Sequence, residues 1–146
     1  MTQQTNTESS VPPDQKLVRA VVGILKRNDK LLIAERPAGK PYSGYWEFPG
    51  GKIEANETSR EALVRELHEE LGITVESAKH WFQHTHAYPD KTVCLEIWLV
   101  EKFSGEPHGK ENQQLRWALI PEILKFPLLE GNWPIMDKIQ LLLQAD

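Results

Sequence analysis

Three glutamates, Glu66, Glu69 and Glu70, stand three and four residues apart in a stretch with helical periodicity. At this spacing their carboxylates share one face of a helix within about one turn. Like charges this close destabilise an isolated helix by roughly a few tenths of a kcal/mol per pair. No lysine is interspersed among them, so the pattern favours a cation bound on that face. Carboxylate oxygens suit hard divalent cations, above all Mg²⁺ or Mn²⁺.

The residues before and within this stretch offer further groups for such a site. Gly50 and Gly51 would let the backbone approach a metal ion or a phosphate closely. Arg65 could pair with one of the glutamates and hold it in place, and Glu57 adds an acid just before the helix. The alternative is an acidic face in contact with solvent, which is common on surface helices.

The helix that carries these acids is predicted over residues 58–71. Thr58 or Ser59 can cap its start, and Gly72 stands where a left-handed residue commonly follows a helix. Its apolar positions recur at helical spacing and predict the face that packs on the rest of the protein. They are Ala62, Leu63, Leu67 and Leu71.

Strands are predicted on both sides of this helix, and a second helix is predicted over residues 134–143. Asn28 and Asp29 separate two aliphatic runs, which indicates an antiparallel hairpin. The expected fold is therefore α/β, with a mixed sheet and helices packed on it. The predicted strands span residues 17–25, 30–35, 45–48, 80–86, 92–103 and 115–120, and Pro49-Gly50-Gly51 ends the third.

The length and net charge of the chain exclude some classes of protein. At 146 residues the chain suits one domain with a core of its own. The net charge is −4 and the basic residues form no run, which argues against binding a nucleic-acid polymer, because such binding neutralises many phosphates. No apolar stretch approaches the roughly 20 residues that span a bilayer, so no membrane contact is expected.

The termini and the cysteine content give further expectations. Residues 1–15 are polar and are predicted to be a disordered leader, with the ordered domain over 16–146. The single cysteine, Cys94, excludes an intramolecular disulfide, and its apolar surroundings predict that it is buried. A reducing, cytoplasmic location suits it, and we expect a monomer.

Residues 51–73 resemble the Nudix box at all nine of its defined positions across 23 residues. Gly51 is followed after five residues by Glu57, and after seven more by the run from Arg65 to Ile73. The resemblance implies an α/β/α sandwich with a mixed sheet, in which the box forms a loop, a helix and a loop. It also implies hydrolysis of a nucleoside diphosphate linked to another group, with water and bound Mg²⁺, for which Mn²⁺ could substitute.

The resemblance also assigns roles within the box. It makes Glu69 and Glu70 direct metal ligands, and Glu66 either a ligand or the base that activates water. It makes the Gly50 carbonyl a further ligand and Arg65 the residue that orients the acidic cluster. The box glutamate before the helix, Glu57, would be structural.

Almost the whole chain, from about residue 17 to 141, resembles the MutT branch of this family, which removes oxidised guanine nucleotides from the precursor pool. The similarity is carried by the stretches Trp46–Lys52, Trp98–Glu101, Ser104–Pro107 and Gly109–Glu111. It makes Glu111 an additional metal ligand or base on a loop opposite the helix. Without the resemblance, Glu111 would be interpreted as an exposed loop acid.

The same resemblance places four residues near the nucleotide. Asn132 matches an asparagine that reads the oxidised purine edge, and its amide offers the donor and acceptor that such an edge needs. Phe48 matches a residue of an aromatic pocket, Arg36 lies near the nucleotide, and Tyr88 would contact it through the backbone. The alternatives are a helix cap for Asn132, a core position for Phe48 and a surface charge for Arg36.

The leading hypothesis is hydrolysis of the nucleoside triphosphate 8-oxo-dGTP to the monophosphate and pyrophosphate. The first alternative is a preference for CTP or oxidised pyrimidine nucleotides within the same chemistry. The second is a non-catalytic module that recognises oxidised guanine, which would lack the box glutamates and carry a basic face. Two histidines, His84 and His86, alternate on a predicted strand; they would face one side, and we expect that side to be solvent.

Overall fold

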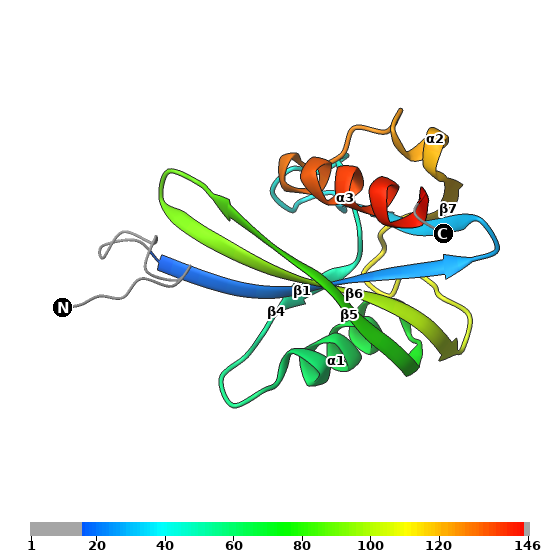
Figure 1. The fold of residues 1–146 in the computed structure, drawn as a ribbon, viewed down its shortest axis with the longest axis horizontal. Helices are drawn as coiled ribbons and strands as arrows, with labels where there is room; N and C mark the ends of the chain where they lie inside the picture. Colours follow the sequence, from blue (N-terminus) through cyan, green and yellow to red (C-terminus); the bar gives the residue numbers. More distant parts are fainter. Residues whose placement is uncertain (1–15, 145–146) are drawn as a thin grey trace.

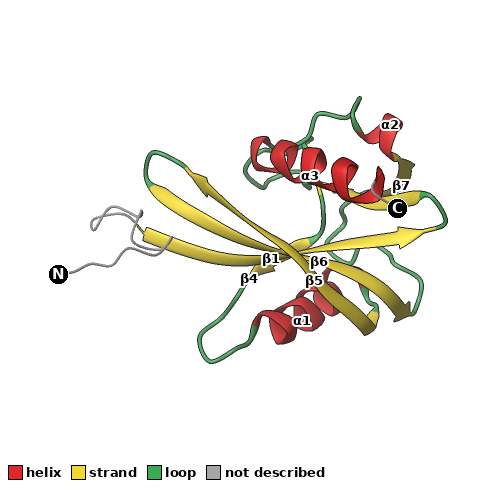
Figure 2. Ribbon diagram, viewed as in Figure 1, coloured by secondary structure: helices red, strands yellow, loops and turns green. Residues whose placement is uncertain are grey.

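The computed structural model describes residues 16–144; the predicted leader and the last two residues lie outside the described part. Strands form a central sheet with helices on both of its faces (Figures 1 and 2). In chain order the elements are β1 (Lys16–Arg27), β2 (Lys30–Glu35), β3 (Trp46–Glu47), β4 (Gly50–Lys52), α1 (Ser59–Leu71), β5 (Thr74–Ala87), β6 (Lys91–Ser104), β7 (Leu115–Leu119), α2 (Ile120–Ile123), a 3-10 turn (Glu130–Asn132) and α3 (Trp133–Gln144).

The sheet is mixed, as the sequence predicts. Its main path runs β3-β2-β1-β6-β5, with β4 paired to β1 and β7 paired to β2. The β1–β6 pair is parallel, and the other named pairs are antiparallel. The predicted hairpin is present, because Arg27 pairs with Lys30 across the Asn28-Asp29 turn. In Figure 1, α1 lies on one face of this sheet and α3 on the other.

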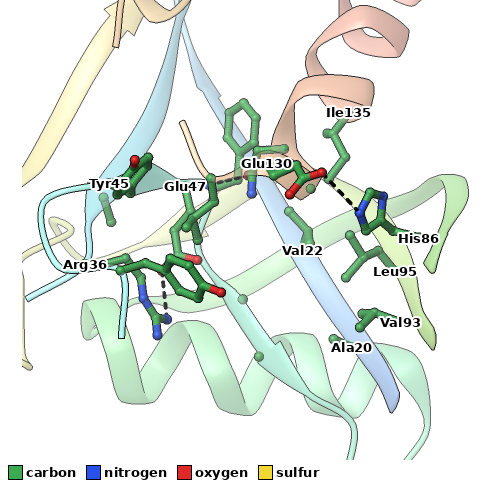
Figure 3. Close-up of a pocket in the computed structure, with 18 of the residues that line it drawn as sticks. Ala20, Val22, Arg36, Tyr45, Glu47, His86, Val93, Leu95, Glu130 and Ile135 are labelled. Carbon is green, nitrogen blue, oxygen red and sulfur yellow. Dashed lines mark hydrogen bonds and ion pairs between the residues drawn. The ribbon is translucent and has the colours of Figure 1, made fainter. Parts of the chain in front are cut away.

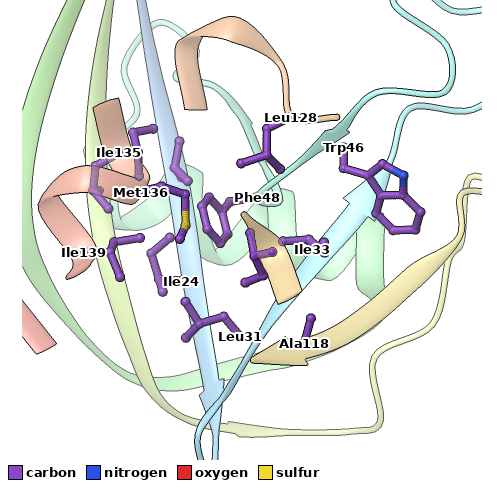
Figure 4. Packing of buried hydrophobic residues seen from close by; sticks show 13 residues of the cluster. Ile24, Leu31, Ile33, Trp46, Phe48, Ala118, Leu128, Ile135, Met136 and Ile139 are labelled. Carbon is purple, nitrogen blue, oxygen red and sulfur yellow. The ribbon is translucent and has the colours of Figure 1, made fainter. Parts of the chain in front are cut away.

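Two buried clusters hold these layers together, because successive residues of β1 point to opposite faces. Val22 and Ile24 pack with Ile135 and Ile139 of α3 in the cluster shown in Figure 4. On the other face of β1 a second cluster packs against the apolar stripe that the sequence predicts for α1. Its members include Val21, Leu25, Ala62, Leu63, Leu67 and Leu71.

Both ends of α1 are fixed by the residues that the sequence indicates. Thr58 Oγ1 accepts from the Glu61 N–H at 3.1 Å, and Glu61 Oε1 accepts from the Thr58 N–H at 2.8 Å, which forms a capping box. Gly72 ends the helix with φ of +73° and donates its N–H to the His68 carbonyl. These two caps set where the helix begins and ends, and its packed apolar stripe sets which way the acidic face points.

The structure departs from the predicted elements at several points. β5 begins at Thr74 instead of residue 80, because register shifts between Val75 and Phe82 break the alternation that marks a strand in sequence. The Gly50–Lys52 segment, predicted to end a strand, is itself the short strand β4. Helix α2 was not predicted, and Cys94 is only partly buried. No helix among residues 16–144 is both long and apolar enough to cross a bilayer.

Candidate active site

A cavity of about 720 Å³ opens beside β1, between the face of α1 that carries the acids and the 3-10 turn before α3. Figure 3 shows Arg36 and Glu47 on one side of it and His86 and Leu95 on the other. Most of the site residues predicted from sequence line this cavity. They are Arg36, Phe48, Gly50, Glu70, Tyr88, Glu111 and Asn132.

Arg65 organises the acids at the α1 end of the site. Its guanidinium makes a bidentate pair with Glu57, at 2.6 and 2.9 Å, and donates to the Lys52 carbonyl at 3.0 Å. The same group reaches Glu66 at 3.1 Å and Glu69 at 3.4 Å. Hydrogen bonds from Arg65 and from the Glu54 backbone lower the pKa of Glu57 to about 2. Arg65 therefore contacts Glu57, Glu66 and Glu69 at the same time.

Glu70 is the most perturbed acid of the site. Burial raises the pKa of Glu70 to about 9, and the charge and hydrogen bond of Glu66 and the charges of Glu111 and Glu47 add to the effect. Burial also raises the pKa of Glu66. Without a cation, Glu70 therefore keeps its proton at neutral pH and shares a hydrogen bond with Glu66.

The oxygen atoms of these acids suit a hard divalent cation, but the side chains are not grouped around one point. Among residues 16–144, no three acidic, histidine or cysteine side chains are grouped closely enough to hold a metal ion. Glu69 is 56% exposed and held by Arg65, whereas Glu66 and Glu70 lie together. Buried carboxylates that repel one another and offer only oxygen atoms are the chemistry that Mg²⁺ or Mn²⁺ would relieve.

Glu111 lies on the loop between β6 and β7, and its side chain is exposed at the cavity rim. Its charge raises the pKa of both Glu70 and Glu47, and the Lys110 N–H beside it donates to the Glu70 carbonyl at 3.1 Å. The loop that carries Glu111 therefore lies beside Glu70 of α1, a proximity that the spacing of the two residues in the sequence does not predict.

Glu47 is a site residue that the sequence interpretation missed. It is partly buried, lines the cavity and pairs with Arg36 at 3.4 Å. Burial raises the pKa of Glu47, and Arg36 opposes that shift. The available signal was an acid between two aromatic residues, Trp46 and Phe48, in a predicted strand. Both aromatics are buried, which leaves the acid facing the cavity.

Asn132 is held by a hydrogen bond that fixes the orientation of its amide. Its Oδ1 accepts from the Phe48 N–H at 3.1 Å, across 84 residues of sequence. The Nδ2 donors and the second lone pair of Oδ1 remain for a ligand. The Phe48 side chain is 3% exposed and belongs to the core, and it also borders the cavity. The core and pocket interpretations of Phe48 are thus compatible.

The β5 side of the cavity carries an aromatic row. The rings of His84 and His86 face the same side, 6.3 Å apart, and the His86 ring lies 4.5 Å from that of Tyr88. The expectation that both histidines face solvent was wrong: both are partly buried, and His86 lines the cavity. The Tyr88 N–H donates to the Lys91 carbonyl at 2.8 Å, and the Lys91 ammonium lies 5.7 Å from the centre of the Tyr88 ring.

The family model of the NUDIX domain matches residues 16–139, and the chain belongs to the Nudix family. Fold and box together define a Nudix hydrolase, and the similarity is to its MutT-like members.

Two curated relatives are equally similar in sequence. The chain is 37% identical to the CTP pyrophosphohydrolase of Escherichia coli (strain K12) over 130 residues, which are 89% of this chain and 96% of that protein. It is also 37% identical to the 8-oxo-dGTP diphosphatase of the same strain over 128 residues, 87% of this chain and 99% of that protein.

Solved structures agree with this assignment. The solution structure of the E. coli ORF135 protein has a TM-score of 0.80 and 37% identity, covering 90% of this chain and 94% of that chain. A MutT structure from work on Aliivibrio salmonicida and Vibrio cholerae has a TM-score of 0.73 and 36% identity, covering 85% and 97%.

The two adjacent glycines of the box offer a matched test of the site. A Cβ on Gly51 would overlap the Glu66 carboxylate, whereas a Cβ on Gly50 would overlap the Val21 backbone carbonyl. We expect Gly51→Ala to displace the Glu66 carboxylate, which can move by side-chain rotation, reducing kcat about a hundredfold with a smaller fall in Tm than Gly50→Ala causes.

Gly50→Ala should instead lower Tm by about 3–9 °C, because the backbone must move. Differential scanning fluorimetry and rate measurements on both variants check this contrast. Equal losses of stability in the two variants would contradict it.

Proposed function

We propose that the protein is a Mg²⁺-dependent nucleoside triphosphate pyrophosphohydrolase that converts 8-oxo-dGTP to 8-oxo-dGMP and pyrophosphate. Such an activity cleans the nucleotide pool and limits mutation. We further propose that it acts as a monomer in the cytoplasm, where the single thiol of Cys94 would stay reduced.

The proposed metal-binding groups are the carboxylates of Glu66, Glu69, Glu70 and Glu111 and the carbonyl of Gly50. When bound, the metal would neutralise the polyphosphate and lower the pKa of the attacking water. Glu66 is proposed to take the proton from that water, and Arg65 holds Glu66 in position through the 3.1 Å hydrogen bond. Arg36, which pairs with Glu47 at the cavity, is proposed to contact the nucleotide.

The observation that carries the choice of base is the fixed amide of Asn132. Guanine presents N7 and O6 as acceptors, and oxidation at C8 places a hydrogen on N7. An amide whose Nδ2 donates to O6 can accept from the N7–H through the free lone pair of Oδ1. With ordinary guanine the same oxygen would face the N7 acceptor, so the hydrogen bond would be lost.

The direct test is pyrophosphate release in the presence of Mg²⁺ from 8-oxo-dGTP, dGTP, CTP and 8-oxo-GTP. We expect kcat/KM for 8-oxo-dGTP to be far above that for dGTP, with the activity lost in Glu69→Gln. An 8-oxo-dGTP rate equal to the dGTP rate would contradict the proposed substrate while leaving the chemistry intact.

Two substitutions at Asn132 separate base recognition from folding. Asn132→Asp keeps an oxygen for the Phe48 N–H but removes the Nδ2 donors, whereas Asn132→Ala removes both. We expect each to lower kcat/KM for 8-oxo-dGTP about tenfold, equivalent to about 1.4 kcal/mol. Both variants lose the donor to O6, which dGTP also carries, but only Asn132→Ala loses the acceptor for the N7–H that 8-oxo-dGTP alone presents. Only Asn132→Ala should therefore lower the ratio of the 8-oxo-dGTP rate to the dGTP rate, and only Asn132→Ala should lower Tm. An unchanged ratio in Asn132→Ala would show that Asn132 does not read the base.

The second candidate is CTP hydrolysis. It is supported by the 37% identity to the E. coli CTP pyrophosphohydrolase, which equals the identity to the E. coli 8-oxo-dGTP diphosphatase. The same four-substrate assay decides between the two candidates. An enzyme that prefers CTP should hydrolyse CTP fastest, and Asn132→Asp should not lower its kcat/KM for CTP.

A further inference from the structure

The loop that carries Glu111 is joined to the last turn of α1 by its backbone. The His108 N–H donates to the Leu71 carbonyl at 3.0 Å, and the Lys110 N–H donates to the Glu70 carbonyl at 3.1 Å. Carbonyls at a helix C-terminus lack partners within the helix, so this loop supplies them. The two elements that bear the acids are therefore in direct contact.

Gln113 adds a side-chain bridge at this junction. Its Nε2 donates to the Glu70 carbonyl at 3.1 Å, and its Oε1 accepts from the Glu111 N–H at 2.8 Å. A single primary amide thus links the main chain of Glu70 to the main chain of Glu111. The Gln113 side chain is partly buried and lines the cavity, so exchange of its partners for water is restricted.

The residues on either side of Gln113 anchor this bridge to the rest of the fold. Asn112 closes a turn by donating its N–H to the Gly109 carbonyl at 3.1 Å. The Gln114 carbonyl accepts from the Glu35 N–H at 2.9 Å, at the end of β2. The chain is thus fixed to the sheet one residue after Gln113, and to α1 by the Gln113 side chain itself.

We propose that Gln113 is a positioning residue that sets the separation between Glu70 on α1 and Glu111 on the loop, so that one cation can be shared between elements far apart in sequence. This inference rests on the proposed metal-binding roles of Glu70 and Glu111. Gln113 itself contacts main-chain atoms of both residues and contributes no charge.

The test measures Mn²⁺ binding to the full chain without nucleotide, by electron paramagnetic resonance, together with amide hydrogen exchange. Gln113→Met has nearly the same shape but loses both hydrogen bonds. We expect its Kd for Mn²⁺ to rise about tenfold, as for loss of groups that support metal ligands. The Glu111 amide should exchange faster, while amides in the middle of α1 keep their protection.

Two further variants test whether the length and the position of the Gln113 amide matter. Gln113→Asn retains the amide but is one methylene shorter, so it cannot span both partners and should also weaken Mn²⁺ binding. Gln114→Met makes the same chemical change one residue away, at an exposed position, and should leave both Mn²⁺ affinity and Glu111 exchange unchanged.

The failure of this proposal is distinguishable from failure of the metal assignment. If Glu111→Gln leaves Mn²⁺ affinity unchanged, Glu111 is not a metal ligand and the proposed ligand set is wrong. Glu111→Gln could instead weaken Mn²⁺ binding while Gln113→Met and Gln113→Asn bind Mn²⁺ like the wild type. In that case the positioning role of Gln113 is wrong, and the proposed metal ligands stand.

Discussion

Replacing Glu70 with glutamine is expected to abolish hydrolysis and, at the same time, to stabilise the metal-free protein. Glu70 is buried among like charges, and its pKa is raised to about 9. Because loss of groups that only support a metal ligand costs about 10–100-fold, loss of a ligand itself should cost more than about a hundredfold in kcat/KM. The glutamine can still donate a hydrogen bond to Glu66 but carries no charge.

The sign of the stability change follows from proton linkage. Between the ordinary pKa of 4.5 and the folded pKa of about 9, the folded protein holds a proton on Glu70 that the unfolded chain has released. Stability of the metal-free wild type therefore falls as pH rises through this window, and Glu70→Gln lacks that contribution.

Thermal unfolding in EDTA at about pH 5 and about pH 9 measures this difference. The Tm of Glu70→Gln should exceed that of the wild type by more at the higher pH. Added Mg²⁺ should then raise Tm in the wild type and much less in the variant. A Tm gap that shrinks with rising pH would contradict the protonation state assigned to Glu70.

Arg65→Lys should cause the largest loss of stability among charge-conserving changes in the box. A surface ion pair contributes about 0–1 kcal/mol, but Arg65 is 23% exposed and its partners Glu57 and Glu66 are 14% and 16% exposed. A lysine ammonium cannot make the bidentate pair and also reach Glu66 and the Lys52 carbonyl.

We expect a loss of about 2–4 kcal/mol and a fall in Tm of about 6–12 °C. The rate should fall as well, because Glu66 loses the group that orients it. Arg60→Lys, on the exposed part of the same helix, is the control and should change neither quantity. A variant Arg65→Lys with the wild-type Tm would show that the network is no stronger than a surface pair.

The features predicted well from sequence are those that depend on neighbours along the chain. The helix that carries Glu66, Glu69 and Glu70 follows from its apolar period and its caps, and both caps are present. The β1–β2 hairpin likewise follows from the Asn28-Asp29 turn between two aliphatic runs. In both cases the preference of the local sequence for a helix or a turn agrees with the packing of the whole fold.

The features missed depend on contacts between distant segments. The bridge from Gln113 to Glu70 uses main-chain atoms, which leave no pattern in the sequence. Glu111 was reached only through family resemblance, since a loop acid has no periodicity. His86 was assigned to solvent because strand alternation tells which residues share a face but not what covers that face.

The two-sided packing of β1 has a consequence for how this scaffold can diversify. One face of the strand supports α1, which bears the proposed metal-binding acids, and the other supports α3 and the turn that carries Asn132. Changes in separate clusters tend to combine additively. Substitutions around Asn132 should therefore alter the choice of base without disabling the proposed hydrolytic step on the other face of β1.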